Sequence, residues 1–403
     1  MTPIARVAAF ASLSIFSVLT VHAQQDPPIT VDTHVDIPFT YMHDPKFDAG
    51  KATPLLVDLG KMERGGLSAA FFVVWVPQHK LDAAGYAKAV AQGEQKYDAI
   101  GRLLLQYPDR IRLATTPEQL VANHKAGLLS AVIEIENGYS LGHDIHRLDA
   151  AFDRGARSIG LAHVGNNDLC TSSLPDTKHG EPEMNSAGDT GMSDFGRAVV
   201  KRANQLGMLV DVSHSSDACV REALKLSTAP VYASHSGARA VLDHPRNLPD
   251  DLLRAIADKG GVVDAVAYKE FLKHDPGREV AEKKLQKAIA KQRGEAEYDS
   301  DKDDYLPAMD AGMAEIQKKY PLATLDDYMD HIQHMVKVAG IDHVGIASDF
   351  DGGGGITGWA NASETRNVTA ALRKRGFSDA DIAKLWGGNL LRVWREVDRD
   401  AEH

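Results

Sequence analysis

Seven side chains that can bind a metal ion or move a proton stand at the ends of short apolar segments of this 403-residue chain. The first segment ends in His34 and Asp36, which are two residues apart and therefore share one face of a strand. Five later segments each end in one such residue: Glu136, His163, His214, His235 and Asp349. Zinc and related divalent ions prefer imidazole and carboxylate ligands. The set therefore predicts a metal-dependent active site.

The residue types in this set fit two metal ions. Three His, one Asp and one Glu supply enough ligands for a pair if the Glu bridges them. Two divalent ions, with zinc as the first expectation, would hold a hydroxide at neutral pH and polarise a carbonyl group. The remaining Asp would carry a proton to a leaving amine, and the remaining His would donate to a developing oxyanion.

A single histidine after an apolar strand is more often a structural residue than a ligand. The chain contains 17 His, of which His331 and His334 lie three residues apart on a predicted helix. That spacing suits a metal ion, but no strand end accompanies it. We interpret these two as packing or surface residues.

Eight apolar segments predict the strands that would position the site. They alternate with amphipathic stretches such as 81–106, 193–206 and 325–338. The predicted strands are 29–35, 67–75, 130–135, 157–162, 208–213, 230–234, 261–267 and 343–348. This alternation predicts an α/β fold, a TIM-like (β/α)8 barrel, in which the C-terminal strand ends meet at one mouth.

The charged segment 273–321 interrupts the alternation. It carries no strand pattern, so we interpret it as a helical insertion into a single barrel domain of residues 24–403. Its acidic run 299–304 only faintly resembles a calcium loop, because position six is Asp304 rather than Gly and position twelve is Asp310 rather than Glu. We predict a solvated acidic turn.

Residues 1–23 have the pattern of a secretory signal peptide. Arg6 precedes an apolar run over 7–21, and Val21, His22 and Ala23 form a cleavage site. The run is shorter than the roughly 20 apolar residues that span a bilayer. We therefore expect an exported protein, periplasmic or secreted, without a stable membrane anchor. The net charge of −11, without a basic run, argues against a nucleic-acid partner.

Two cysteines, Cys170 and Cys219, are too few for a disulfide framework. Export would permit a disulfide between them. We favour two free or partly buried thiols, with the disulfide as the alternative.

Several short motifs follow one another in a fixed order. They are HVD at 34–36, IENG at 135–138, GMSDFG at 191–196, VDVSH at 210–214, ASHS at 233–236, RNLPDD at 246–251, DFDG at 349–352 and GGNLLRV at 387–393. This ordered set, which extends from Asp32 nearly to Val397, resembles the membrane (renal) dipeptidase family, also called the dehydropeptidase family. The resemblance implies a barrel hydrolase that cleaves dipeptides with two metal ions.

The resemblance also implies a metal-ligand set. By it, His34 and Asp36 bind the first ion, His214 and His235 bind the second, and Glu136 bridges the two.

Three further roles follow from the resemblance. His163 would steady the tetrahedral intermediate, and Asp349 would be the proton shuttle. Arg246 would bind the free carboxylate of the substrate, a task suited to its two-pronged guanidinium. Asp351 is the alternative to Asp349 and would otherwise brace its own turn.

The chain departs from the family pattern near the site. Asn137 replaces a glycine, Tyr139 stands where a His is common, and Ala162 stands where Thr is usual. The stretch 165–170 also differs, so the disulfides of mammalian members cannot be transferred. These departures leave the metal site complete and the substrate preference open.

Three functions compete at this point. The first is a dipeptidase, and the second is a related metal-dependent amidase, such as an N-acyl-amino-acid deacylase or a peptide-tailoring enzyme. The third is a catalytically inactive binding protein, which the complete set of site residues argues against. Arg246 favours substrates with a free carboxylate. The sequence leaves open the native metal, the preference for D- or L-residues and the oligomeric state, a homodimer included.

Overall fold

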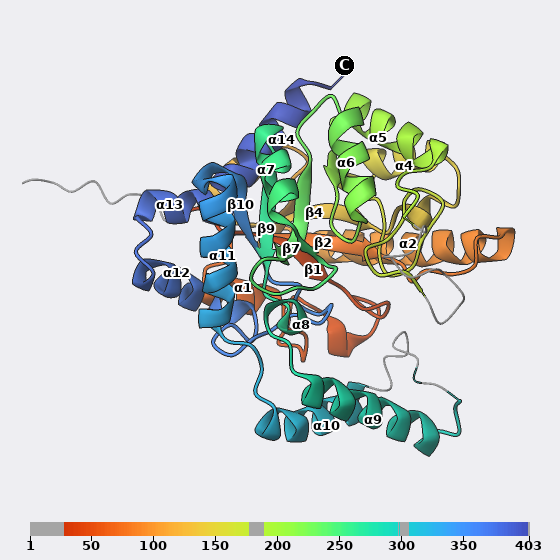
Figure 1. Ribbon diagram of the computed structural model, residues 1–403, viewed down its shortest axis with the longest axis vertical. Helices are drawn as coiled ribbons and strands as arrows, with labels where there is room; N and C mark the ends of the chain where they lie inside the picture. The colour runs from red at the N-terminus through yellow and green to blue at the C-terminus, as the bar shows by residue number, and fades with distance from the viewer. Residues whose placement is uncertain (1–27, 177–188, 297, 299–305, 402–403) are drawn as a thin grey trace, which may run out of the picture.

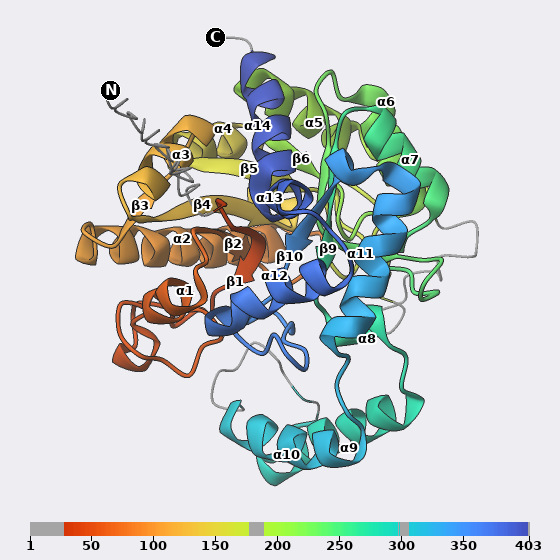
Figure 2. The same ribbon diagram turned by 90° about the vertical axis from the view of Figure 1, so that its left-hand side faces the viewer.

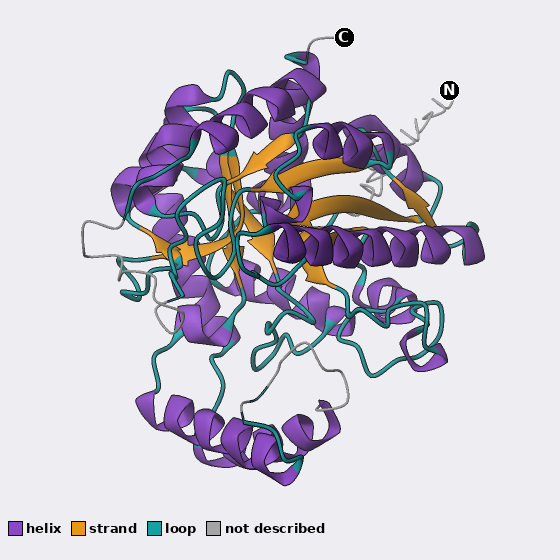
Figure 3. Cartoon of the chain, turned by 90° about the vertical axis from the view of Figure 1, so that its right-hand side faces the viewer, coloured by secondary structure: helices purple, strands orange, loops and turns teal. Residues whose placement is uncertain are grey.

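The computed structural model describes residues 28–176, 189–296, 298 and 306–401. Its centre is a barrel of parallel strands in the order β1-β2-β4-β5-β6-β7-β9-β10, which helices surround (Figures 1 and 3). The strands are β1 (Val31–Asp36), β2 (Ala69–Trp75), β4 (Leu129–Glu136), β5 (Ala156–Gly160), β6 (Leu209–Asp211), β7 (Tyr232–Ala238), β9 (Val262–Val266) and β10 (Val344–Ala347). Each predicted strand overlaps one of these, so the predicted (β/α)8 barrel is confirmed.

Two short strands lie off this path. The first, β3 (Ile111–Leu113), pairs with β4, and the second, β8 (Asn247–Leu248), pairs with the end of β7. The sequence did not predict them, because three and two residues are too few to show a hydrophobic period.

The barrel closes between its first and last strands through a single isolated bridge, Val35 to Phe350. Two backbone hydrogen bonds flank the bridge, from Asp36 N to Phe350 O at 2.9 Å and from Asp349 N to His34 O at 3.2 Å. We call this junction the seam. It carries residues of the predicted site on both of its sides.

Capping residues fix the limits of the helices. The predicted helices over 81–106, 193–206 and 325–338 are α2, α5 and α11. Asp82 caps α2, Ser193 caps α5, and Thr324 forms a capping box with Asp327 at the start of α11. The helices around the barrel are α1 (Leu59–Gly65), α2 (Ala83–Gln106), α3 (Pro117–Lys125), α4 (His146–Asp153), α5 (Asp194–Leu206), α6 (Asp217–Leu226), α7 (Asp250–Asp258), α8 (Lys269–Leu272), α11 (Leu325–Ala339), α12 (Thr365–Lys374), α13 (Asp379–Ala383) and α14 (Asn389–Arg399).

The barrel strands are buried on both faces, which is why their sequences show no alternation of apolar and polar residues. Neighbouring residues of β2 illustrate this. The ring of Phe71 contacts Trp394 of α14, with centroids 6.1 Å apart, whereas the ring of Phe72 contacts Tyr41 at 6.3 Å. One layer of the core therefore lies between the barrel and its helices.

Two helices project from one end of the molecule (Figures 1 and 2). They are α9 (Pro276–Gln292) and α10 (Leu306–Lys319), which pack against each other within the predicted 273–321 segment. The acidic run 299–304 and the predicted signal peptide, residues 1–23, lie outside the described residues. Within the described part of the chain, no helix is long and apolar enough to cross a bilayer.

Cys170 and Cys219 form a disulfide, with Cα atoms 6.1 Å apart, so the expectation of two free thiols is wrong. The loop after β5 folds back on itself, and the backbones of Cys170 and Met192 form an isolated antiparallel β-bridge. Cys219 lies in the first turn of α6, whose cap Ser216 shares a 2.7 Å hydrogen bond with the hydroxyl of Thr171. These loop contacts join two cysteines that are 49 residues apart.

Candidate active site

The predicted metal ligands converge where the barrel strands end. His34 and Asp36 belong to β1, Glu136 ends β4, and His235 lies within β7. His214 comes shortly after β6. His34, Glu136, His214 and His235 are each 7% exposed or less. A barrel whose strand ends point to one mouth brings these residues together although they lie far apart in the chain.

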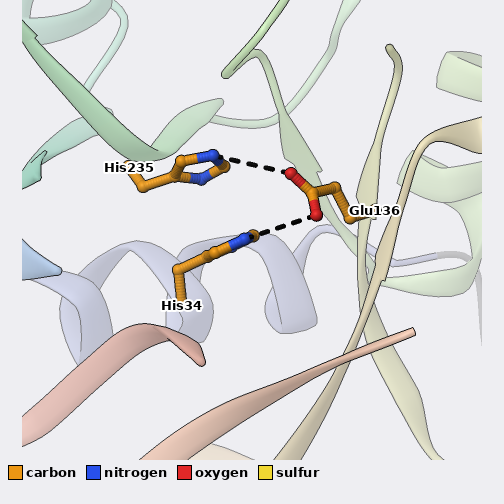
Figure 4. Close-up of side chains that lie close together, drawn as sticks. All are labelled: His34, Glu136 and His235. Atoms are coloured by element: carbon orange, nitrogen blue, oxygen red, sulfur yellow. Dashed lines mark ion pairs between the residues drawn. The ribbon is translucent and has the colours of Figure 1, made fainter. Parts of the chain in front are cut away.

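The carboxylate of Glu136 stands between two histidine groups. Its Oε2 lies 3.4 Å from His34 Nε2, and its Oε1 lies 3.1 Å from His214 Nε2 and 3.5 Å from His235 Nε2. Figure 4 shows the rings of His34 and His235 each directed at one oxygen of this carboxylate. A carboxylate with each oxygen facing separate imidazoles can bridge two ions.

The distances between donor atoms fit divalent ions. Two ligand atoms that are each about 2.0–2.1 Å from a tetrahedral zinc ion lie about 3.3 Å from each other. His214 Nε2 and His235 Nε2 are 2.9 Å apart, and His34 Nε2 lies 3.7 Å from Asp36 Oδ2. Three overlapping groups have donor atoms within 4.8 Å of one another: His34, Glu136 and His235; Glu136, His163 and His214; and His34, Asp36 and Asp349. The donor set therefore has the chemistry and spacing to bind divalent metal, with His163 and Asp349 among the grouped residues.

Residues that the sequence analysis missed orient two of the imidazoles. The Ser234 hydroxyl lies 2.7 Å from both His235 Nδ1 and Asp211 Oδ2, so it can accept from the ring and donate to the carboxylate. Glu134 Oε2 lies 3.4 Å from His34 Nδ1. In both cases the partner engages Nδ1 and leaves Nε2 facing Glu136. Hydrogen bonds to the other ring nitrogen orient metal-binding histidines in the same way. Glu134 could have been suspected, because it lies two residues before Glu136 on the same strand face.

Burial and neighbouring charges determine the ionisation of the site. Burial lowers the pKa of His214 and His235 well below the usual histidine value, which keeps both imidazoles neutral and able to bind metal. Burial alone would raise the pKa of Glu136, but the imidazoles of His34 and His163 hold it well below its usual range. The central carboxylate is therefore ionised. His214 and His235 on one side of it are neutral, whereas the charges of Glu136 and Glu134 outweigh burial and raise the pKa of His34 well above its usual value.

The site opens into a cavity of about 560 Å³, large enough for a small peptide. His163 lies in its wall, with its ring 5.4 Å from that of Trp75. Burial lowers the pKa of His163 to about 4. A neutral His163 has one ring N–H to donate. Other cavity-lining residues include Asp36, Ile37, Phe39, Trp75, Lys96, Glu136, Leu174, His214, His235, His244, Tyr268, Glu270, Phe271, Asp349 and Asp351.

Arg246 lies behind this wall rather than in it. It is 2% exposed, and its Nη2 donates to the backbone oxygen of His235 at 3.0 Å. Its guanidinium carbon lies 5.2 Å from the ring centroid of Phe271, which lines the cavity. Its Nε is buried and makes no hydrogen bond within the described structure. The predicted carboxylate-binding residue is therefore adjacent to the cavity but covered.

Asp349 and Asp351 both follow β10 and both line the cavity, but their surroundings differ. The carboxylate of Asp351 accepts hydrogen bonds from Leu56 N at 2.8 Å and Val57 N at 3.2 Å. Asp349 instead groups with His34 and Asp36. Burial, together with the charge of Asp36, raises the pKa of Asp349 well above its usual value.

Several residues of the site have left-handed backbone conformations, which store strain in residues other than glycine. The φ angles are 64° at His214, 58° at Asp349 and 63° at Asp351. The departure from the family pattern at Asn137 has a structural reason, because its φ is 65°. Asn tolerates this region better than most residues, so it can replace the usual glycine directly after Glu136.

His331 and His334, the two histidines on one helix that we set apart from the predicted site, have structural contacts, as predicted. His331 is fully buried, and its Nδ1 accepts a hydrogen bond from Ala238 N at 3.0 Å. His334 Nε2 lies 2.7 Å from Asp250 Oδ1.

A sequence profile described as membrane dipeptidase (peptidase family M19) matches residues 20–403. This chain belongs to the membrane dipeptidase family. Membership makes it a dipeptide-hydrolysing metalloenzyme, and the convergence of ligands described above is what that chemistry requires. The resemblance inferred from the motif order is thereby confirmed.

Individual relatives agree with this assignment. The chain is 27% identical over 368 residues to dipeptidase tcpJ of Claviceps purpurea, a match covering 89% of this chain and 73% of that protein. It is 33% identical, with a TM-score of 0.80, to the probable dipeptidase PvdM from Pseudomonas aeruginosa, covering 93% and 96% of the two chains. A metallo peptidase from Rhodobacter sphaeroides, solved with a phosphinate mimic of the dipeptide L-Ala-D-Ala, shares the fold at 20% identity with a TM-score of 0.71, over 92% of this chain and all of that one.

Proposed function

We propose that this enzyme hydrolyses dipeptides with two zinc ions, which Glu136 bridges. The observation that carries the proposal is the division of the Glu136 oxygens between His34 on one side and the pair His214 and His235 on the other. With Asp36, these residues would hold the ions. Bound divalent ions would supply Lewis acidity, which lowers the pKa of water and polarises a peptide carbonyl.

The remaining site residues would handle the proton and the developing charge. Asp349 would take a proton from the attacking water and pass it to the leaving nitrogen, which its cavity position beside Asp36 supports. His163 would donate its ring N–H to the oxyanion, because its lowered pKa keeps it neutral. Asp351, held by the backbone of Leu56 and Val57, would position the loop.

The free carboxylate of the substrate would pair with Arg246. In the present arrangement Phe271 lies against this guanidinium, so binding requires a small movement of that ring. A cation fixed next to His235 sets a short distance between the substrate's C-terminus and the attacked carbonyl. We therefore expect dipeptides to be cleaved and longer peptides to be refused. The dipeptide mimic bound by the Rhodobacter sphaeroides relative is consistent with this length.

The test combines metal analysis with a substrate panel. Purified protein should contain two zinc ions per chain, and His214→Ala should lose one, whereas a control at the exposed His146, His146→Ala, should keep both. The panel contains dipeptides, tripeptides, dipeptide amides and N-acetyl amino acids. Dipeptide cleavage that disappears on chelation and returns with zinc supports the proposal. Full activity without metal contradicts it, and cleavage of N-acetyl amino acids alone favours the deacylase.

A further inference from the structure

The wall of the active-site cavity contains a basic residue to which no role has been given. Lys96 is the only Lys or Arg among the described residues that line this cavity. It belongs to α2 and is 2% exposed. Lysine is seldom buried to this degree, because removing an ammonium group from water is costly. A buried lysine at this position therefore suggests a functional role.

Two aromatic rings hold the ammonium group at the edge of the cavity. Lys96 Nζ lies 4.9 Å from the ring centroid of Phe39 and 5.1 Å from that of Trp75, and both rings line the same cavity. Cation–π contacts of this kind favour the charged form of the side chain. Its charge is felt at the reacting centre: it opposes the rise in the pKa of Asp36 that burial and Glu136 cause, and it adds to the lowering of the pKa of His163 that burial causes.

Lys96 and Arg246 lie against different aromatic residues of the cavity. Lys96 stands with Phe39 and Trp75, whereas Arg246 stands with Phe271 and His235. His163 lies within electrostatic reach of both cations. A substrate with a single carboxylate needs only one of them, and of the two only Lys96 is in direct contact with the cavity.

We propose that Lys96 is a specificity-determining residue that binds a carboxylate group of the substrate. The inference rests on the proposed dipeptidase function. A dipeptide can offer such a group from two sources. One is an acidic side chain, with Arg246 still pairing with the C-terminus; the other is the C-terminus itself, in which case Lys96 takes the place proposed for Arg246. The group bound is a carboxylate in both cases, so substrate pairs that differ in only one of these two groups are needed to identify its source.

The experiment compares matched substrates on three forms of the zinc-loaded enzyme: unmodified, Lys96→Met and Lys96→Arg. One pair contains Glu or Gln at a single position, and the other contains a dipeptide and its C-terminal amide. The unmodified enzyme should prefer the acid in at least one pair. Lys96→Met should reduce that preference about ten- to a hundred-fold, chiefly through KM, as expected for one charge-assisted hydrogen bond. Lys96→Arg should retain part of it.

The substrate pair for which Lys96→Met loses the preference for the acid identifies the source of the carboxylate. Lys88→Met is the control, because Lys88 is exposed on the same helix, and it should change neither preference. If Lys96→Met slows acid and neutral substrates equally, Lys96 only balances the charge of Asp36 and the inference is overturned.

Ligand binding separates this inference from the proposed function. Calorimetry would measure the affinity of phosphinate dipeptide mimics with a carboxylate or an amide. An enzyme that cleaves no dipeptide, yet loses its preference for the acid mimic in Lys96→Met, would refute the function and keep the inference. If the unmodified protein binds the carboxylate and amide mimics equally well, and binds mimics with Glu and with Gln equally well, the inference is overturned while the proposed function stands.

Discussion

Two aspartates separated by one residue have different surroundings in this active site. Both Asp349 and Asp351 line the cavity and both have positive φ angles. However, the oxygens of Asp351 are already engaged by two backbone N–H groups, which a proton carrier would have to release. Asp349 instead groups with His34 and Asp36, two of the residues that would hold metal.

We therefore predict that Asp349→Asn lowers kcat about 10²- to 10⁴-fold, the range expected for loss of general acid–base catalysis. The amide keeps the shape of the side chain but cannot carry the proton. Steady-state kinetics and metal analysis on the same preparation would test this, with metal content largely unchanged. Asp351→Asn should affect thermal stability more than kcat, and the reverse pattern would show that the two roles are exchanged.

Residues at strand ends could be predicted from the sequence, but their supporting contacts could not. Glu136 and His235 follow recognisable apolar runs, and the barrel rule places such residues at one mouth. The link from His235 through Ser234 to Asp211 depends on which strands are neighbours in the barrel. Lys96 belongs to a helix whose pattern gives no indication that one of its lysines faces the site.

At the scale of elements, the loop between β5 and α5 shows where sequence patterns fail. Helix limits followed from capping residues such as Ser193, which is a local signal. The pairing of Cys170 with Cys219 depends instead on how a loop folds back on α6, and no local signal encodes that. Arg246 illustrates the same difficulty, because its cover by Phe271 comes from a different connection.

We predict that the disulfide contributes about 2–4 kcal/mol to the free energy of unfolding, since it closes a long loop of the unfolded chain. The double variant Cys170→Ser, Cys219→Ser should therefore unfold at a lower temperature than the oxidised protein, and reductant should lower the Tm of the unmodified protein only. Calorimetry with and without reductant measures both effects. Two free thiols in the denatured, unreduced protein would show that the bond does not form.

At the scale of the whole molecule, we expect metal binding and stability to be coupled. The site brings together Asp36, Glu136 and Asp349 in the interior, where their mutual repulsion opposes folding. Burial and the charge of Glu136 both raise the pKa of Asp36, to about 6. Cations bound among these carboxylates would remove the repulsion and favour the folded state.

Removal of metal should lower the Tm by on the order of 5 °C, because ions that bind only the folded state stabilise it by mass action. Differential scanning calorimetry of chelated and zinc-restored protein would measure the shift. His146→Ala, at an exposed position, should show the same shift as the unmodified protein. An unchanged Tm after complete metal removal would indicate that the carboxylates are neutralised by protons instead.

The apolar run over residues 7–21 leads to a prediction about processing. If Val21, His22 and Ala23 are a cleavage site, the exported protein begins at Gln24. Intact-mass measurement of protein recovered from the periplasm or medium tests this. A full-length chain retained in the cytosol would count against export.

The seam between β1 and β10 determines when the active site can come into existence. Val35 and Phe350 meet across it, and Asp32 reaches Ser348 N over a separation of 316 residues. During synthesis, His34 and Asp36 emerge early and remain without Asp349 until nearly the entire chain has left the ribosome. A truncated or partly made chain therefore lacks the proposed proton carrier, and we expect an unfinished peptidase not to act on the dipeptides around it.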